Sequence, residues 1–147
     1  MKSRTRARGL ALQVLYEVDM AKHPPAEALR TRLAESPLPD DLAEFVRQII
    51  FGVLPLLHEL DELIARYAPE WPLEQIAAID RNILRIALWE FAVQRETPIK
   101  VAINEAVELA KLYGSDSAPR FVNGVLGSLA DYQHEIHQQV RLKQGPG

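Results

Sequence analysis

The chain has 147 residues, of which 48% are hydrophobic and 25% are charged, and its formal net charge at pH 7 is −3. This composition is ordinary for a soluble globular protein and excludes an intrinsically disordered chain. The absence of cysteine excludes disulfides and zinc–thiolate sites, and no apolar run approaches the ~18 residues of a membrane span, so we expect a cytoplasmic protein without a membrane contact.

Apolar residues recur at helical spacing along nearly the whole chain, which predicts an all-α fold of about seven helices. The first helix is expected from Thr5 to Ala21, because the segment KHPP that follows contains two prolines that cannot donate a backbone hydrogen bond. A short helix is expected from Ala26 to Glu35. One long helix is expected from Asp41 to Tyr67, with a kink near Gly52 to Pro55.

The segment YAPEWP, residues 67–72, predicts a boundary between two subdomains, because its two prolines separate periodic stretches. We therefore expect an N-terminal helical subdomain of residues 1–66 and a C-terminal helical subdomain of residues 67–147.

Four helices are predicted in the second subdomain. They span Leu73 to Ala78, Ile79 to Val93, Ile99 to Tyr113, and a segment that begins near Ser117 or Arg120. The second of these is apolar around much of its circumference, so we expect it to be central and buried on more than one side. Gly114 is expected to adopt the left-handed conformation of a helix end, and the Gln- and His-rich tail is expected to fade from helical structure.

The positive charge is concentrated at the start of the chain. The first sixteen residues hold four of the 17 lysines and arginines and none of the 20 acidic residues, and the four cations are Lys2, Arg4, Arg6 and Arg8. Cations at a helix start oppose the helix dipole, so local stability does not favour them there. Arginine binds phosphate bidentately, and the pattern therefore predicts a polyanion contact, with a solvated, frayed terminus as the alternative.

The sequence shows no pattern of an enzyme. There is no phosphate-binding glycine motif and no nucleophile elbow, and the acidic pairs Asp61–Glu62 and Glu105–Glu108 are interpreted as charged helix faces. His134 and His137 are too few for a metal site and are interpreted as solvated. We therefore expect no catalytic residue, no metal and no cofactor, and keep an uncharacterised helical hydrolase only as a remote alternative.

Three asparagines lie within apolar helical stretches, where their side chains need partners: Asn82, Asn104 and Asn123. They indicate either a buried network that fixes helix packing or a surface amide that contacts a ligand beside Arg120 and Phe121. Phe121 itself is interpreted as a core residue in preference to a ring that stacks on a base.

Four segments resemble the successive blocks of the NusB family of transcription antitermination factors, in that family's order and spacing: RTRARGLALQVLYEVD, IDRNILRIALWEF, IKVAINEAVELAKLYG and RFVNGVL. The succession of VAINEAVELAK and FVNGVL is the most specific part of this resemblance. Two positions depart from the family pattern, since Trp89 stands where tyrosine is usual and Pro119 stiffens the loop before Phe121.

The resemblance implies a compact helical bundle of two subdomains and a non-enzymatic role in rRNA transcription. It implies binding of a single-stranded boxA RNA together with NusE, a small-subunit ribosomal protein, within the elongating RNA polymerase complex. It assigns RNA contacts to Arg4, Arg6 and Arg8, to which Lys2 adds a fourth cation, and to Arg120 and Phe121. It assigns the NusE-facing surface to Tyr16, Asp80 and Arg85. The alternative function is a homodimeric protein-interaction module whose RNA site is masked or absent.

Overall fold

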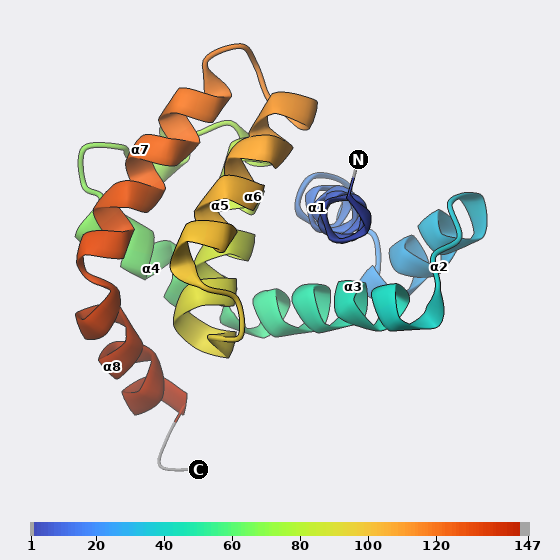
Figure 1. Cartoon of the computed structure of the whole chain (residues 1–147), viewed down its shortest axis with the longest axis horizontal. Helices are drawn as coiled ribbons and strands as arrows, with labels where there is room; N and C mark the ends of the chain where they lie inside the picture. The colour runs from blue at the N-terminus through green and yellow to red at the C-terminus, as the bar shows by residue number, and fades with distance from the viewer. Residues whose placement is uncertain (1, 145–147) are drawn as a thin grey trace.

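The computed structural model of the chain describes residues 2–144, and this part is all-helical without any strand. The elements are α1 (Ser3–Ala21), α2 (Pro25–Glu35), α3 (Asp40–Val53), η1 (Leu54–Leu56), α4 (Leu57–Tyr67), η2 (Leu73–Gln75), α5 (Ala78–Leu88), η3 (Trp89–Gln94), α6 (Ile99–Tyr113), α7 (Ala118–Asp131) and α8 (Gln133–Gln144). In Figure 1, α1, α2 and α3 form one side of the molecule and the remaining helices form the other. The predicted fold class is confirmed.

The centre of the fold is α5, which packs against α1, α4, α6 and α7. Every residue of the segment 82–92 is buried, including the aromatic rings of Trp89 and Phe91, so the prediction of a central helix is confirmed. One continuous apolar cluster contains side chains from both sides of residue 67. The division into subdomains at that residue stays a prediction.

The long helix predicted from Asp41 to Tyr67 is interrupted at the predicted place. α3 ends at Val53, the segment Leu54–Leu56 forms a single 3-10 turn around Pro55, and α4 continues from Leu57. Because proline has no N–H and its ring clashes with the preceding turn, the tighter turn is where the chain changes from one helix to the next.

Three local predictions were wrong. Gly114 has φ −95° and ψ −177°, which is extended, and the left-handed positions belong instead to Lys22 and Arg95. The segment predicted as helical from Leu73 forms only a 3-10 turn. The C-terminal tail continues as α8, because Ile136 and Val140, four residues apart, are buried on one of its faces.

The helix predicted through Val93 also changes character near its end. α5 stops at Leu88, and the segment Trp89–Gln94 is a wider π-helix that is closed by the N–H of Arg95 donating to the carbonyl of Glu90. π-helical turns are rare and concentrate at functional positions. Here the turn carries Glu90, whose side chain lies in the interior.

The close approach of α3 and the π-helix requires glycine at position 52. A Cβ atom there would overlap the Trp89 indole, whereas a Cβ atom at Gly127 on α7 would meet nothing within 4 Å. We predict that Gly52→Ala lowers the free energy of unfolding by about 1–3 kcal/mol, as expected for overpacking. Gly127→Ala is the matched control and should stabilise by up to ~1 kcal/mol, since alanine is the better helix former. Urea denaturation followed by circular dichroism measures both, and equal effects of the two substitutions would contradict the packing argument.

Candidate nucleic-acid interface

The start of α1 presents three exposed cations. Lys2 occupies the N-cap position of the helix. The side chains of Lys2, Arg4 and Arg6 are exposed, and the first turn holds no acidic residue. No side chain caps the helix, so its first N–H groups and the positive end of its dipole add to the three charges. This end of α1, defined by Lys2, Arg4 and Arg6, is called the cationic end below.

The cationic end has two sides, because residues two apart on a helix are separated by about 200°. The Arg4 guanidinium lies over the Phe45 ring at 4.4 Å from the centroid, in a hollow that also contains Asp41, Glu44 and Glu96. Arg6 lies on the other side of α1 and makes no ion pair with any residue between 2 and 144. Of the two arginines at the cationic end, Arg6 is therefore the one whose charge is less compensated by neighbouring carboxylates.

Arg8 does not belong to the cationic end, and the prediction that it binds phosphate is corrected. Its side chain is 3% exposed and forms a bidentate ion pair with Glu90, with Nη2 to Oε1 at 2.8 Å and Nε to Oε2 at 2.9 Å. Nη1 lies 3.5 Å from Glu105, which also accepts a hydrogen bond from Thr5 at 2.7 Å. Arg8 shares a helix face with Arg4, as predicted. At the position of Arg8, however, one turn after Arg4, Phe45 covers this face and the side chain is buried.

The Arg8–Glu90 pair is completed by Thr97, whose hydroxyl donates to Oε1 of Glu90 at 3.0 Å. Both charged side chains lie in the interior, where an unpaired charge would be costly. The pair therefore fixes α1 against the π-helix, while Thr5 and Glu105 fix it against α6. A signal in the sequence could have indicated this role, because Glu90 interrupts the apolar stretch ILRIALWEFA.

A second polar network corrects the assignment of Arg85 to a partner-facing surface. Arg85 is 6% exposed and donates to both oxygens of Asp61 at 2.8 Å. It also donates to Asn82, which in turn donates to Asp19 on α1. The charge of Arg85 is thus compensated by carboxylates of its own chain. Asn82 belongs to a buried polar network, as the first of the two interpretations predicted.

Asp19 joins this network from α1. Burial acts to raise the pKa of Asp19, but hydrogen bonds from Arg81 and Asn82 and the charges of Arg85 and Arg81 outweigh burial and hold the pKa below its ordinary value. The carboxylate is therefore kept ionised, and it links the C-terminal part of α1 to α5.

The two other partner-facing candidates lie in different surroundings. Tyr16 is 39% exposed on α1, four residues before Met20, which is 56% exposed. Asp80 is 7% exposed, its Oδ1 atom has no hydrogen-bond partner, and burial raises the pKa of its carboxyl. Asp80 lines a hollow beside α7, and its contact with a partner stays a prediction.

That hollow, of about 300 Å³, contains Phe121 and an aromatic neighbour that the sequence did not indicate, Trp71. The rings meet edge to face with their centroids 6.3 Å apart. Phe121 is half-buried against the apolar core, and Arg120, next to it, is exposed. Pro119 lies in the first turn of α7, where the missing N–H costs nothing, so it does not distort the helix start.

Asn104 and Asn123 are exposed, unlike Asn82. Asn123 lies one turn after Arg120 on α7, which is consistent with the alternative of a surface amide beside Arg120 and Phe121. The structure thus gathers Arg120, Phe121 and Asn123 on one helix, and the cationic end on another.

Most of the acidic and histidine residues considered for chemistry have structural contacts. Asp61 and Glu105 pair with arginines, as described above. The prediction that His137 is solvated was wrong, because this side chain is half-buried. Its Nε2 accepts a hydrogen bond from Arg95, and its Nδ1 lies 3.3 Å from the carbonyl of Ala92, so His137 attaches α8 to the π-helix. His134 is exposed, as predicted. Among residues 2–144, no three His, Asp or Glu side chains converge as metal ligands would, and no helix has the length and apolarity to cross a membrane.

Comparison with known proteins identifies the family. The model of the NusB family matches residues 5–131. A transcription antitermination protein NusB of Roseiflexus castenholzii is 47% identical over 134 residues, which cover 90% of this chain and 94% of that protein. The corresponding protein of Bacillus pumilus is 41% identical over 139 residues and covers 95% of this chain and 100% of that protein.

Solved structures agree with this result. T. maritima NusB matches with a TM-score of 0.79 at 33% identity and covers 87% of this chain and 90% of that chain. A chain in the crystal structure of antitermination factors NusB and NusE in complex with dsRNA matches with a TM-score of 0.80 at 25% identity. The match covers 89% of this chain and 98% of that chain.

The helical fold and these relatives define the class of protein, which is a transcription antitermination factor and not an enzyme. More particularly, the chain belongs to the NusB family, as the resemblance of its four sequence blocks indicated.

The buried ion pair predicts how substitutions at Arg8 behave. Arg8→Ala leaves Glu90 charged and buried without its partner, and we expect a loss of about 3–5 kcal/mol in the free energy of unfolding. The double variant Arg8→Met, Glu90→Met removes both charges together and should recover most of this loss. Chemical denaturation of the wild type, of Arg8→Met alone, of Glu90→Met alone and of the double variant forms the thermodynamic cycle. Additive effects of the two single substitutions would show that the pair is not coupled.

Proposed function

We propose that this chain binds a single-stranded boxA-type RNA of rRNA leader transcripts, together with NusE, and joins the elongating RNA polymerase complex to suppress premature termination. The observation that carries the proposal is the cationic end of α1. Three exposed cations project from an uncapped helix start on a chain that is otherwise acidic. An uncapped helix start with added arginines is suited to phosphate groups.

The hollow beside α7 supports limited base preference. Phe121 and Trp71 offer aromatic surface, and Arg120 and Asn123 offer hydrogen-bond donors at the same helix. Single-stranded RNA is recognised by stacking of splayed bases on such rings and by polar contacts to base edges. The cationic end then supplies affinity, and the surface around Phe121 supplies selectivity.

The proposed contact with NusE uses the exposed side of α1 around Tyr16 and Met20. Two exposed large side chains one turn apart give a helix face of the kind that a partner protein covers. A chain similar to this one is present in a crystal structure with NusE and dsRNA, which supports both kinds of partner. Joining two weak RNA sites in one complex raises affinity for RNA without strengthening either site.

The number of phosphate contacts is testable by salt dependence. With Arg8 buried, Lys2, Arg4 and Arg6 remain for direct phosphate contact, fewer than the four cations predicted from the sequence. The logarithm of the association constant for a boxA oligonucleotide should fall with the logarithm of salt concentration with a slope of about −2.1. Affinity should therefore drop roughly twentyfold between 50 and 200 mM salt.

Arg6→Ala should make that slope shallower by about 0.7. It should also lower the affinity more than Arg4→Ala does, because Arg4 already shares a hollow with three carboxylates. Arg30→Ala, which removes an exposed arginine on α2, is the matched control and should leave the slope unchanged. Fluorescence anisotropy measures each titration, first alone and then with NusE, whose presence should tighten binding. An affinity that does not respond to salt, or equal losses in all three variants, would refute the proposal.

A further inference from the structure

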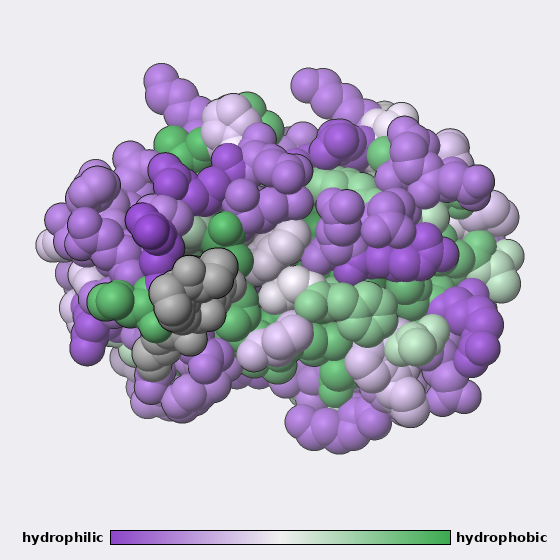
Figure 2. All heavy atoms as spheres, turned by 90° about the horizontal axis from the view of Figure 1, so that it is seen from below, coloured by the Kyte–Doolittle hydropathy of each residue, from purple (hydrophilic) through white to green (hydrophobic). Residues whose placement is uncertain are grey.

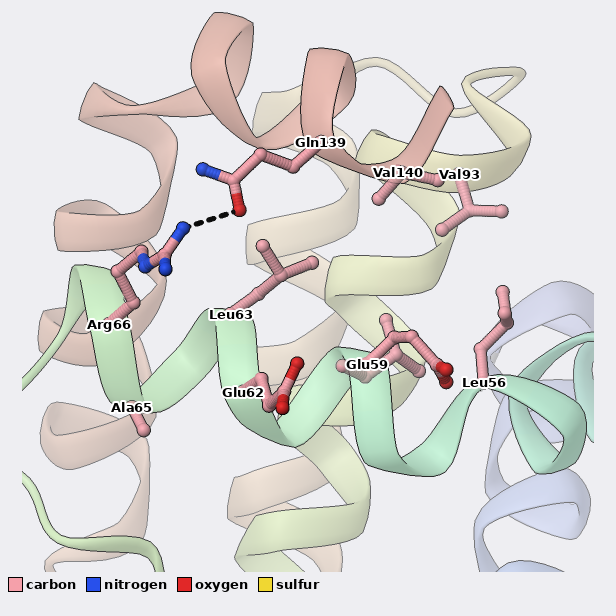
Figure 3. Close-up of a pocket in the computed structure, with 10 residues that line it drawn as sticks. Leu56, Glu59, Glu62, Leu63, Ala65, Arg66, Val93, Gln139 and Val140 are labelled. Carbon is pink, nitrogen blue, oxygen red and sulfur yellow. Dashed lines mark hydrogen bonds between the residues drawn. The ribbon is translucent and has the colours of Figure 1, made fainter. Parts of the chain in front are cut away.

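The helix α8 borders two cavities of different character. One is a groove between α4 and α8 with mostly apolar walls, and Figure 3 shows Leu63 and Val140 facing the space between these helices. Apolar residues also reach the surface between hydrophilic flanks when the molecule is seen from below (Figure 2). The other cavity, called the α8 hollow below, has a volume of about 390 Å³ and lies between the start of α8, the end of the π-helix and the start of α6. Most of its lining side chains are polar, so it suits a polar ligand.

The α8 hollow gathers three basic side chains, which are Arg95, His134 and His137. None of the described residues that line it is acidic. The carboxylate of Glu96, next to Arg95 in the sequence, lines the separate hollow that contains Arg4. The α8 hollow therefore collects positive charge and hydrogen-bond donors without the carboxylates that surround Arg4.

The charge of Arg95 is not compensated within the chain. Its Nη1 lies 2.8 Å from Nε2 of His137. Arginine has only donors, so Nε2 accepts this hydrogen bond, and the imidazole carries its proton on Nδ1, 3.3 Å from the Ala92 carbonyl. Within residues 2–144, Arg95 makes no ion pair and no other side-chain hydrogen bond. Most of its five N–H donors are therefore open to a ligand.

The loop that carries Arg95 is fixed by the interior of the protein. Arg95 has φ 63°, a left-handed conformation that is unfavourable for a residue with a Cβ atom. Its backbone N–H donates to the carbonyl of Glu90, and the hydroxyl of Thr97 donates to the side chain of the same glutamate. Because Glu90 also pairs with Arg8, the loop is tied to the buried network, and the position of Arg95 is set before any ligand binds.

The other wall of the hollow is fixed by the packing of α8. Ile136 is buried, and Arg66 of α4 donates to Gln139 at 2.8 Å (Figure 3). Residues three apart share a helix face, so His134 and His137 both line the hollow. The histidines are thus presented by an anchored helix.

The start of α6 adds to the positive potential of the hollow. The N-cap residue is Pro98, no side chain caps the helix, and the first turn contains the exposed Lys100 and no acidic residue. Pro98 and Ile99 line the hollow, so the first N–H groups of α6 and the positive end of its dipole lie at the edge of the hollow.

We propose that the α8 hollow binds a terminal phosphate group, of the kind carried by a small phosphomonoester or by the 5′ end of an RNA. The planar guanidinium of Arg95 binds two phosphate oxygens, and His134 and the Gln133 amide donate to the remaining ones. A terminal phosphate carries up to two negative charges and enters a hollow from one side, whereas a phosphodiester carries one charge and is flanked by chain on both sides. An arginine and two histidines in a concave site therefore favour the terminal group.

Nuclear magnetic resonance of the histidine rings, recorded as inorganic phosphate is added at neutral pH and constant ionic strength, tests the proposal. The chain has four histidines, and His23 and His58 lie outside the hollow, so they are internal controls. The signals of His134 and His137 should shift and reach saturation, while those of the controls stay in place. Sulfate should compete with phosphate, and chloride should not.

Substitutions identify the groups that bind phosphate. Arg95→Asn removes the cation but keeps the fold, because asparagine tolerates the left-handed backbone, and it should weaken phosphate binding by roughly tenfold or more. His134→Gln replaces an exposed side chain and should weaken binding several-fold, as followed through the His137 signal. Arg141→Gln, at the other end of α8, is the matched control and should leave binding unchanged.

Two comparisons distinguish the sources of the phosphate. A nucleoside 5′-monophosphate is compared with its nucleoside, and a boxA-type RNA with a 5′-phosphate is compared with the same RNA that ends in a 5′-hydroxyl. A preference for the phosphorylated probe that Arg95→Asn abolishes supports the site, and the pair that shows this preference identifies the source. Arg6→Ala should leave the histidine shifts unchanged, so this proposal and that of the RNA contact at α1 can fail separately. Equal shifts of all four histidines, shifts without saturation, or binding unaffected by Arg95→Asn would overturn the proposal.

Discussion

The buried ion pair between Arg8 and Glu90 determines what the start of this chain can do. It joins α1 to the π-helix through two short hydrogen bonds inside the protein, and Thr97 and Glu105 complete its polar surroundings. An arginine and a glutamate at such depth are stable only as a pair, so α1 has one favourable position in the fold. The residues before Arg8 then extend from an anchored helix and not from a free terminus.

A second constraint acts at the other end of α1, where Asp19 meets Arg81, Asn82 and Arg85. The helix is thus held at both ends by charges that belong to the central helix and its continuation. The exposed positions of α1 include Arg6, just before the first network, and Tyr16, just before the second. The proposed RNA contact and the proposed protein contact are therefore presented by one rigid element, which suits a factor that joins RNA to a partner protein.

The sequence predicted the helices well because their apolar residues repeat with the helical period, and prolines mark most of the breaks. Pro55 indicated the interruption between α3 and α4, and the helix from Ile99 to Tyr113 has the predicted bounds. Periodicity could not predict that position 114 is extended or that Ile136 and Val140 have a surface to bury against, since both depend on neighbours that are distant in sequence. The α8 helix and its groove were therefore missed.

The candidate site was predicted only in part for the same reason. Alternating arginines in RTRARG indicated a cationic segment, but not which guanidinium turns inward, because that depends on Glu90, 82 residues later. The inward position of Arg8 had a signal, since Leu12 and Leu15 follow it at spacings of four and seven and share its face. Arg85 likewise lies within an apolar stretch, where burial with a partner was the better interpretation. Trp71 had no local signal, because its contact with Phe121 is made across the fold.

The central claim is that Arg8 anchors α1 while Arg4 and Arg6 remain available to phosphate. Nuclear magnetic resonance of the arginine Nε–Hε groups, recorded as a boxA oligonucleotide is added, tests this claim directly. The account predicts that the signals of Arg4 and Arg6 shift with RNA, while that of Arg8 keeps its position and exchanges slowly with solvent because it is buried. An Arg8 signal that exchanges rapidly and shifts together with the other two would contradict the account.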